Sequence, residues 1–500
     1  MVRVRRCGRT CIRRTVGLRR RCGFCIRLNA SAGRFLCFVF CVSVVSVRVF
    51  LCVVCGADSS LVIASASPAA PADAHRGGVP WVRLQWWGVL LGVGFAAASV
   101  VMAWLFVFPQ VDEPTDLRVY ALASSWLWAG LDPYSRAFEL VVYQGWPWTN
   151  PVPAAVLYAP LGWGSVGVWD APWLGVQFVA LAGVVWLSFG RLLVRVPRRG
   201  RRVAALVGLV VAATGLDSVI DTFALGQVNV LVALLVLTDV VAAGQHPWVD
   251  RLRRVLPRGV LVGVAAAVKV TPGLVIVWWL VTRQFRAAAW AVGTFAGLWV
   301  AAFVVAPAVT WRWVTQGGAF EGVQRLGDYA ASLGNQSLMA NVSRWVDVVP
   351  APGWMWIPAA VVVIVVGMIA GARAYRGGYP LAGVVLVMLP ALLSSPIAWT
   401  HHGVWLIPAF AVILGDGRDP RRVFWLMMST PLWFVHNRTW GEALANATGF
   451  TAYYATFYVL VFVAVWWVSG HRTSGYSADR GDPGQPRQAG EPGRAPMTTP

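Results

Sequence analysis

Apolar runs long enough to cross a lipid bilayer recur along almost the whole chain. Each run holds roughly 18–23 residues, the length at which an α-helix spans the hydrocarbon core. Hydrophobic residues make up 58% of the 500 positions and only 13% are charged, with a mean hydropathy of +0.62. A soluble domain cannot hide that much apolar surface from water. The sequence therefore predicts an all-α, polytopic membrane protein.

The net charge of +21 does not indicate a nucleic-acid partner. The basic residues gather in short segments between the apolar runs, a pattern that orients a chain in a membrane. These segments are Arg191–Arg202, Arg251–Arg258, Arg283/Arg286, Arg373/Arg376, Arg418–Arg422 and the tail from His471. The loops 109–170, 216–228, 307–352, 395–402 and 436–451 contain few basic residues and alternate with them. With the basic loops in the cytoplasm, the chain makes about ten spans of the plasma membrane, its termini are cytoplasmic and the other loops are extracytoplasmic.

The segment 259–281 breaks this alternation because basic clusters flank it on both sides. Lys269 and Pro272-Gly273 interrupt its middle, where proline and glycine end a helix. Each arm spans roughly half a bilayer. A re-entrant pair of half-helices fits these features, and a single span beside one misassigned loop is the alternative.

The two ends of the chain differ in composition from the centre. All eight cysteines lie in the first 55 residues. That segment is interpreted as an extension from a wrongly chosen start codon, as a signal or extra anchor, or as a metal site. A shared zinc site is disfavoured, since one C-x-x-C pair lies in an Arg-rich run and the other ends an apolar run. We divide the chain into an N-terminal extension (1–80), a membrane domain (81–470) and a disordered cytoplasmic tail (471–500).

Polar groups suited to chemistry cluster in the loops assigned to the outside. Asp116 follows the first reliable span, and a carboxylate there can act as general base on a hydroxyl; Asp112 and Glu113 are equally close to the membrane. The stretch Tyr120–Gly130 is expected to form an interfacial helix. The other candidates for substrate binding in or next to these loops are Tyr120, Gln227, Asn229, Asn335, Gln336, Arg344 and Arg438.

Three further candidate residues, a pair of histidines and a lysine, carry or can carry positive charge. His401 and His402 are adjacent at the end of a span, but neighbouring side chains on a helix point about 100° apart, so we expect no metal between them. Lys269 is the single lysine among 42 basic residues. A charge at that depth is costly, so it is interpreted either as a ligand of a lipid phosphate or as a structural ion pair.

Several blocks together resemble glycosyltransferase family 87, the GT-C-type membrane mannosyltransferases of actinobacteria. They are DLRVY (116–120), AGLDPY (129–134), WTNPVPAAVLYAPL (148–161), GQVNVLVALLVLTDV (226–240), AAAVKVTP (265–272), GNQSLMANVSRW (334–345) and SPIAWTHHGVWLIP (395–408). The resemblance implies a GT-C fold and a polyprenyl-phosphate sugar donor, carrying mannose or in some members arabinofuranose. It also implies a glycolipid or cell-envelope glycan acceptor, Asp116 as catalytic base, and a histidine of the last block assisting at the phosphate or acceptor.

The chain departs from the family pattern at two places. Thr400 stands where the family usually has an acidic residue, and Asn150-Pro151-Val152-Pro153 replaces a Tyr-Pro-Pro. The expected reaction is an inverting displacement in which Asp116 deprotonates the acceptor and polyprenyl phosphate leaves, without a metal or other cofactor. A transporter or flippase and a non-catalytic lipid-binding paralogue are the rival interpretations. The absence of a detectable inverted repeat disfavours the transporter.

Overall fold

The computed structural model describes residues 92–427 except for 95, 102, 108–112, 143–144, 165–166, 242–250, 252, 254, 319–323, 416, 420–421 and 425. The predicted extension 1–80, the tail 471–500, the loop 436–451 with Arg438, and Asp112 all lie outside the described residues. Within these residues the chain is helical and contains no strand, as the composition predicts.

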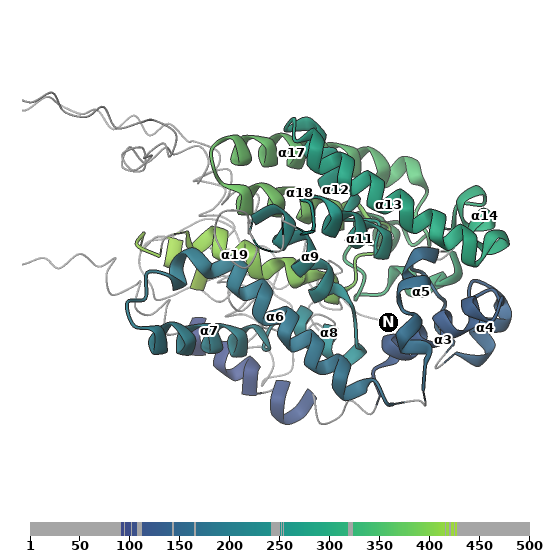
Figure 1. The fold of residues 1–500 in the computed structure, drawn as a ribbon, viewed down its shortest axis with the longest axis horizontal. Coiled ribbons are helices and arrows are strands. Elements are labelled where there is room, and N and C mark those ends of the chain that lie inside the picture. The colour runs from purple at the N-terminus through teal and green to yellow at the C-terminus, as the bar shows by residue number, and fades with distance from the viewer. Residues whose placement is uncertain are drawn as a thin grey trace, which may run out of the picture. The chain divides into compact units, whose positions relative to one another are not determined.

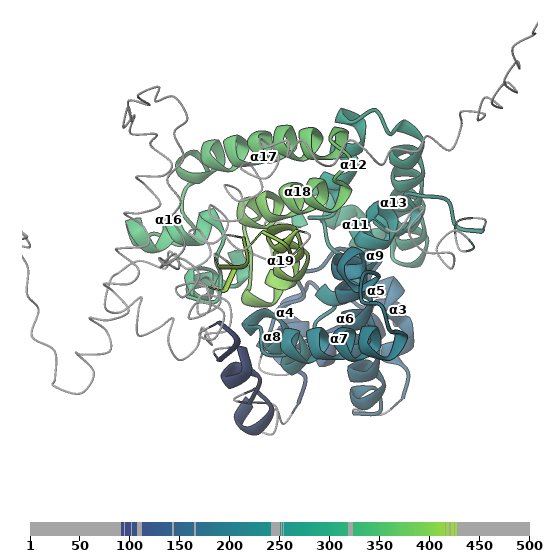
Figure 2. The ribbon, with the colours of Figure 1, turned by 90° about the vertical axis from the view of Figure 1, so that its left-hand side faces the viewer.

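The described helices comprise a set of longer or more apolar helices and a set of other, mostly short elements that connect them (Figures 1 and 2). The longer or more apolar helices are α6 (Asp170–Leu193), α7 (Arg199–Ala213), α9 (Asn229–Val241), α11 (Val260–Val268), α12 (Gly273–Val281), α13 (Phe285–Val305), α17 (Gly353–Arg376), α18 (Pro380–Ser394) and α19 (Leu406–Leu414). The connecting elements are η1 (Ala103–Val107), α3 (Thr115–Trp128), α4 (Arg136–Val141), α5 (Val152–Leu157), η4 (Ala159–Gly162), α8 (Asp217–Leu225), α14 (Pro307–Thr315), η5 (Gly327–Ala331), α16 (Leu338–Val346) and η6 (Thr400–Trp405).

Three of the described helices, α6, α13 and α17, are long and apolar enough to cross a membrane. The pair α7 and α8 makes a fourth candidate, bent by 79° at its break. About ten spans were predicted from the alternation of charge, and that number is not confirmed for the described part of the chain. One reason is visible in the segment predicted as the loop 216–228, which instead contains the separate helix α8.

The predicted break in the segment 259–281 is confirmed. Helix α11 ends at Val268, Lys269 adopts an extended backbone, and α12 begins at Gly273. The two arms form a hairpin whose ends meet, since the Arg258 guanidinium lies 5.2 Å from the Trp279 ring. Its position in the membrane remains a prediction.

The hairpin reaches about halfway along α13. Gly259 closely approaches Ala287, and Gly263 closely approaches Ala291, so α11 and α13 run side by side in the same direction. With the same rise per residue in both helices, the end of α11 lies level with about residue 296 of α13. Lys269 is therefore placed at the inner tip of the hairpin, level with the middle of α13.

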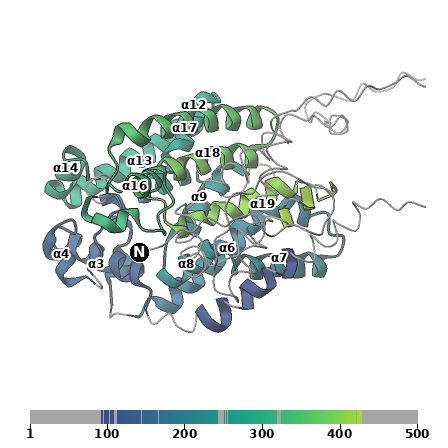
Figure 3. The ribbon, with the colours of Figure 1, turned by 180° about the vertical axis from the view of Figure 1, so that it is seen from behind.

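Helices from distant parts of the sequence enclose the hairpin. Helix α12 packs on α17 and α18, while α11 packs on α9 and α5. Seen from behind, α18 lies between α17 and α19 (Figure 3) and contacts both of them. The short helices of segment 113–162 gather at one end of this assembly, where α3 contacts both α5 and η4 (Figure 1).

Candidate active site

The structure brings five of the predicted site residues into one polar network, which we call the central network: Asp116, Tyr120, Gln227, Lys269 and His402. The Gln227 amide is its hub. Its Nε2 donates to Asp116 Oδ2 at 2.5 Å, and its Oε1 accepts from Tyr120 Oη at 2.6 Å and from Lys269 Nζ at 3.4 Å. Lys269 Nζ also lies 3.0 Å from His402 Nε2. A carboxylate and an ammonium group thus meet through a single amide, and the imidazole joins them through its contact with the ammonium group.

The first turn of α3 presents Asp116 and Tyr120 on the same side of the helix, because they are four residues apart. Two contacts hold this turn in place. Arg118 forms a two-pronged ion pair with Asp170 at the start of α6, with both N–O distances 2.7 Å. Gly226 has a φ of +72° and lies so close to Leu117 that a Cβ would come within 2.8 Å of the Leu117 Cβ.

Hydrogen bonds from two other side chains hold the hub residue Gln227 in place. Gln177 of α6 donates from its buried amide to the carbonyl oxygens of Gln227 (2.7 Å) and Thr222 (3.0 Å). Asn229, the first residue of α9, donates to Gln227 Oε1 at 3.4 Å. Both side chains are buried, so α6 and α9 together set the position of the hub.

The two adjacent histidines have different surroundings. His402 is the one that contacts Lys269. His401 is 5% exposed, and its backbone carbonyl accepts a hydrogen bond from Thr222 at 3.3 Å. Their rings meet edge to face with centroids 4.9 Å apart. His402 is thus the histidine that contacts Lys269 in the central network.

The environment of Asp116 suits a general base. Burial raises the pKa of this carboxyl to about 6, with a smaller raising effect from nearby Asp221. The hydrogen bond from Gln227 and the charge of Lys269 oppose the shift. A base with a pKa near the working pH combines a useful ionised fraction with good proton affinity.

Asn335, Gln336 and Arg344 lie in a neighbouring module that supports the histidine segment. The Asn335 amide donates to Ala330 O (2.8 Å) and Pro396 O (3.2 Å) and accepts from the backbone N–H groups of Ser337 (3.2 Å) and Ala398 (2.8 Å). This uses its full hydrogen-bonding capacity. The bonds of the Asn335 amide to Pro396 and Ala398 thus hold the backbone segment that leads into His402, and a role of Asn335 in substrate binding stays a prediction.

The other two residues of this module also bind its backbone. Gln336 donates through its side-chain amide to Leu333 O, and its backbone N–H donates to Ala398 O at 2.9 Å. Arg344 donates to three carbonyl oxygens, those of Ala331, Ser332 and Asn335, at 2.8–3.0 Å. Burial lowers the pKa of Arg344 to about 10. Neither residue contacts the central network through a bond found in the described part of the chain.

Some residues near the site were missed by the sequence analysis. Asp221 is close enough to Asp116 to raise its pKa, and Gln177 orients the hub. The sequence signal that could have found them is a polar side chain within an apolar helix, because such a group needs a hydrogen-bonding or charged partner when it is buried. In the residues that the structure describes, no three His, Cys, Asp or Glu side chains are grouped so as to hold a metal ion.

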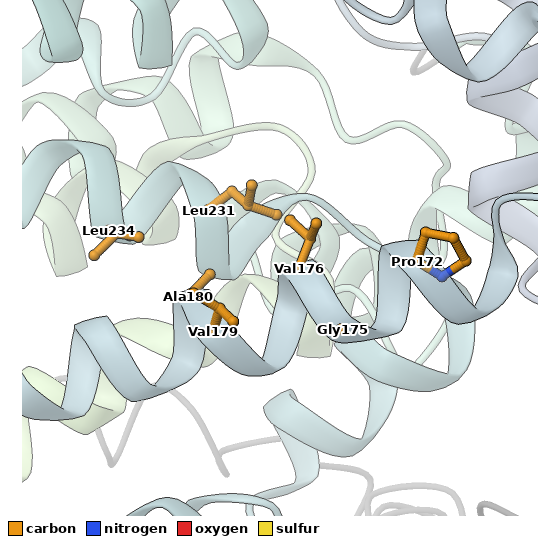
Figure 4. A pocket seen from close by; sticks show the side chains of 7 residues that line it. All are labelled: Pro172, Gly175, Val176, Val179, Ala180, Leu231 and Leu234. Atoms are coloured by element: carbon orange, nitrogen blue, oxygen red, sulfur yellow. The ribbon is translucent and has the colours of Figure 1, made fainter.

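A separate apolar pocket of about 470 Å³ lies between α6 and α9 (Figure 4). It is lined by Pro172, Gly175, Val176, Val179, Ala180, Leu231 and Leu234. These residues occupy a different face of α6 from Gln177. The pocket offers no group that could take part in acid–base chemistry.

Comparison with known proteins agrees with the resemblance seen in the sequence. The model of "Glycosyltransferase family 87" matches residues 148–396. A polyprenol-phosphate-mannose-dependent alpha-(1-2)-phosphatidylinositol mannoside mannosyltransferase of Mycobacterium tuberculosis is 30% identical over 358 residues, which cover 69% of this chain and 80% of that protein. No solved structure matches the chain.

Two further relatives have a related printed activity, that of a polyprenol-phosphate-mannose-dependent alpha-(1-2)-phosphatidylinositol pentamannoside mannosyltransferase. The one from Mycobacterium tuberculosis is 31% identical over 70% of this chain and 77% of its own length. The one from Mycolicibacterium smegmatis is 29% identical over 72% of this chain and 81% of its own length.

Proposed function

Because this chain belongs to glycosyltransferase family 87, we propose that it transfers mannose from a polyprenyl-phosphate donor to a hydroxyl of a glycolipid. Family membership and the apolar helices make it a membrane-bound glycosyltransferase. The relatives' printed activities favour mannose as the sugar and a phosphatidylinositol mannoside as the acceptor. Arabinofuranose is the alternative sugar, and a cell-envelope glycan the alternative acceptor.

The central network is the observation that carries this proposal. Transfer from a sugar phosphate needs a base for the acceptor hydroxyl and positive charge for the departing phosphate. Asp116 supplies the first, with a pKa of about 6. Lys269, with His402 at 3.0 Å, supplies the second. A passive lipid-binding protein has no need for a base with a tuned pKa beside a buried cation, and the family match disfavours a transporter.

The proposed reaction is a single inverting displacement. Asp116 takes the proton from the acceptor hydroxyl, the hydroxyl oxygen attacks the anomeric carbon, and the bond to the phosphate oxygen breaks. Negative charge then develops on the polyprenyl phosphate, where Lys269 stabilises it and His402 keeps the ammonium group aligned. Gln227 orients base and cation at once, because its amide bonds to both. The phosphate is a good leaving group and Lys269 provides the charge, so the proposal includes no metal ion.

The test is transfer by the purified full-length protein in detergent. Radiolabelled polyprenyl-phosphate-mannose and phosphatidylinositol mannosides should give a labelled, lengthened glycolipid at the same rate with and without EDTA. The arabinofuranose donor, assayed in parallel, should give none. Transfer from the arabinofuranose donor and not from the mannose donor would make arabinofuranose the transferred sugar. Loss of transfer in EDTA would overturn the metal-free reaction.

We also propose that the active site opens to the extracytoplasmic side of the plasma membrane, because Arg-rich loops resist translocation. A cysteine-free variant with its eight native cysteines changed to serine can carry single exposed cysteines. On intact cells, a membrane-impermeant maleimide should label cysteines at Leu140 and Trp345, which are 76% and 87% exposed. It should label those at Arg199 and Val255 only after lysis.

One outcome of this labelling would contradict the single site itself. Leu140 follows the segment of Asp116, and Trp345 neighbours the module that holds the histidine segment. If cysteines at these two positions were labelled from opposite sides, the groups of one reaction would be separated by a bilayer of roughly 30 Å.

A further inference from the structure

Two buried polar atoms beside the central network have no hydrogen-bond partner among the described residues. They are the indole Nε1 of Trp148 and the hydroxyl of Tyr158. Trp148 is 1% exposed and Tyr158 is 6% exposed, so bulk solvent does not reach these two atoms. Native proteins satisfy nearly all buried donors, and an exception near a site calls for a ligand or another explanation.

The rings of Trp148 and Tyr158 form a cluster with Tyr120, which we call the aromatic cluster. Tyr158 stacks on Tyr120 with centroids 4.8 Å apart and planes 19° apart. Trp148 meets Tyr120 edge-on at 6.0 Å and Tyr158 edge-on at 6.3 Å. Tyr120 belongs to the central network through its bond to Gln227. The unpartnered donors are thus one ring away from that network.

The chemistry of the aromatic cluster matches a sugar ring better than a phosphate. A pyranose has C–H faces that pack on aromatic rings and a rim of neutral hydroxyls that accept hydrogen bonds. Trp148 and Tyr158 are neutral donors at the pH of the reaction, since an indole N–H does not ionise and burial raises the pKa of the Tyr158 hydroxyl. The phosphate instead has a cation available in Lys269.

We propose that Trp148 and Tyr158 bind hydroxyl groups of the transferred sugar and so select the donor. This inference rests on the proposed function and names the part of the site that recognises the sugar. The two residues enter the site from the segment 148–158, which α5 holds against α3, α11 and α13. Tyr120 then links the two parts of the site. Its ring stacks on Tyr158, and its hydroxyl donates a hydrogen bond to the hub Gln227.

Replacing Tyr158 by phenylalanine separates sugar binding from simple packing. The substitution keeps the stacked ring and removes only the hydroxyl. If the hydroxyl binds the sugar, kcat/KM for polyprenyl-phosphate-mannose should fall about 10- to 100-fold, the cost of a lost hydrogen bond in a desolvated site. The thermal unfolding midpoint without substrate should stay the same or rise, because an unpartnered buried hydroxyl is removed. Trp148→Phe should show the same loss of kcat/KM.

Trp278→Phe is the matched control for the indole. Trp278 is also fully buried, and its Nε1 has no hydrogen-bond partner in the part of the chain that the structure describes, but it lies in α12 against Tyr375 of α17. Its substitution should leave kcat/KM within about twofold of the wild type, an effect of a few tenths of a kcal/mol by the usual conversion. Equal losses in Trp148→Phe and Trp278→Phe would mean that indole packing alone is being measured, and would overturn the inference.

Deoxy donors provide the decisive measurement. Polyprenyl-phosphate-mannose analogues lacking the 3-, 4- or 6-hydroxyl are assayed with the wild type and with Tyr158→Phe. With the wild type, kcat/KM for one analogue should be about 10- to 100-fold lower than for the complete donor. With Tyr158→Phe, kcat/KM for that analogue should equal the value for the complete donor, because the hydrogen bond is already absent. Independent, multiplying losses for all three analogues would overturn the role of Tyr158. A wild type that transfers no mannose at all would overturn the proposed function, and this inference with it.

Discussion

Replacing Asp116 by asparagine is expected to lower mannosyl transfer by about 10²–10⁴-fold, the usual contribution of a general base. Asparagine has the shape of the carboxylate but cannot accept a proton. Its side-chain oxygen can still accept the hydrogen bond that Gln227 donates to Asp116, so the variant should fold with an unchanged thermal unfolding midpoint. The measurement is kcat/KM with labelled donor, beside thermal unfolding of both proteins.

Glu113→Gln is the matched control for this prediction. Glu113 lies one turn before Asp116 and is half-exposed at 3.5 Å from Arg118; it was an equal candidate for the base on sequence alone. Its loss should change kcat/KM by less than about tenfold. More than a tenth of wild-type activity in Asp116→Asn, or equal losses in the two variants, would remove Asp116 from the role of base.

The pH profile of the wild type gives a second check on the same residue. Asp116 must be ionised to accept a proton, and its pKa is raised to about 6. Transfer should therefore be full above that pH and fall as the pH drops through about 6, rather than through 3.8 as for an ordinary aspartate. The residual activity of Asp116→Asn should not fall as the pH drops through about 6.

Replacing Lys269 by methionine is expected to lower kcat/KM by about 10²–10³-fold, the range found when one group that stabilises developing charge is removed. Methionine has nearly the length of lysine without its charge. The loss follows because Lys269 is the cation that contacts both the hub Gln227 and His402. It is measured as kcat/KM, with donor binding followed separately by displacement of labelled polyprenyl phosphate.

Lys269→Arg distinguishes charge stabilisation from a structural ion pair. The guanidinium keeps the charge, so the variant should recover part of the lost activity and of the affinity for polyprenyl phosphate. A structural role predicts a different pattern, in which Lys269→Met lowers the unfolding midpoint while binding of polyprenyl phosphate stays at the wild-type level. That pattern would assign Lys269 to folding rather than to the leaving group.

The local features of the chain were readable from the sequence because they depend on neighbouring residues. The broken segment around Lys269 and Pro272 was predicted, since proline removes a backbone donor and collides with the preceding turn. The helix expected at Tyr120–Gly130 exists and begins earlier, at Thr115. The number of membrane spans could not be predicted from neighbouring residues in the same way. Helices α9 and α18 are apolar but only 13 and 15 residues long, and the length of such a helix depends on what it packs against.

The residue types that could do the chemistry are readable from the sequence alone: a carboxylate, a lysine and a histidine pair lie in apolar surroundings that make each of them costly unless partnered. Which of them meet depends on the tertiary fold. Gly226 lets the hub approach α3, the hairpin carries Lys269 to it, and the clamp by Asn335 leads the chain into His402. That His402 contacts Lys269, and that the Asn335 amide holds the backbone of segment 396–398, could be seen only from distances between segments far apart in the chain. Such contacts depend on packing of whole helices, and no local pattern encodes them.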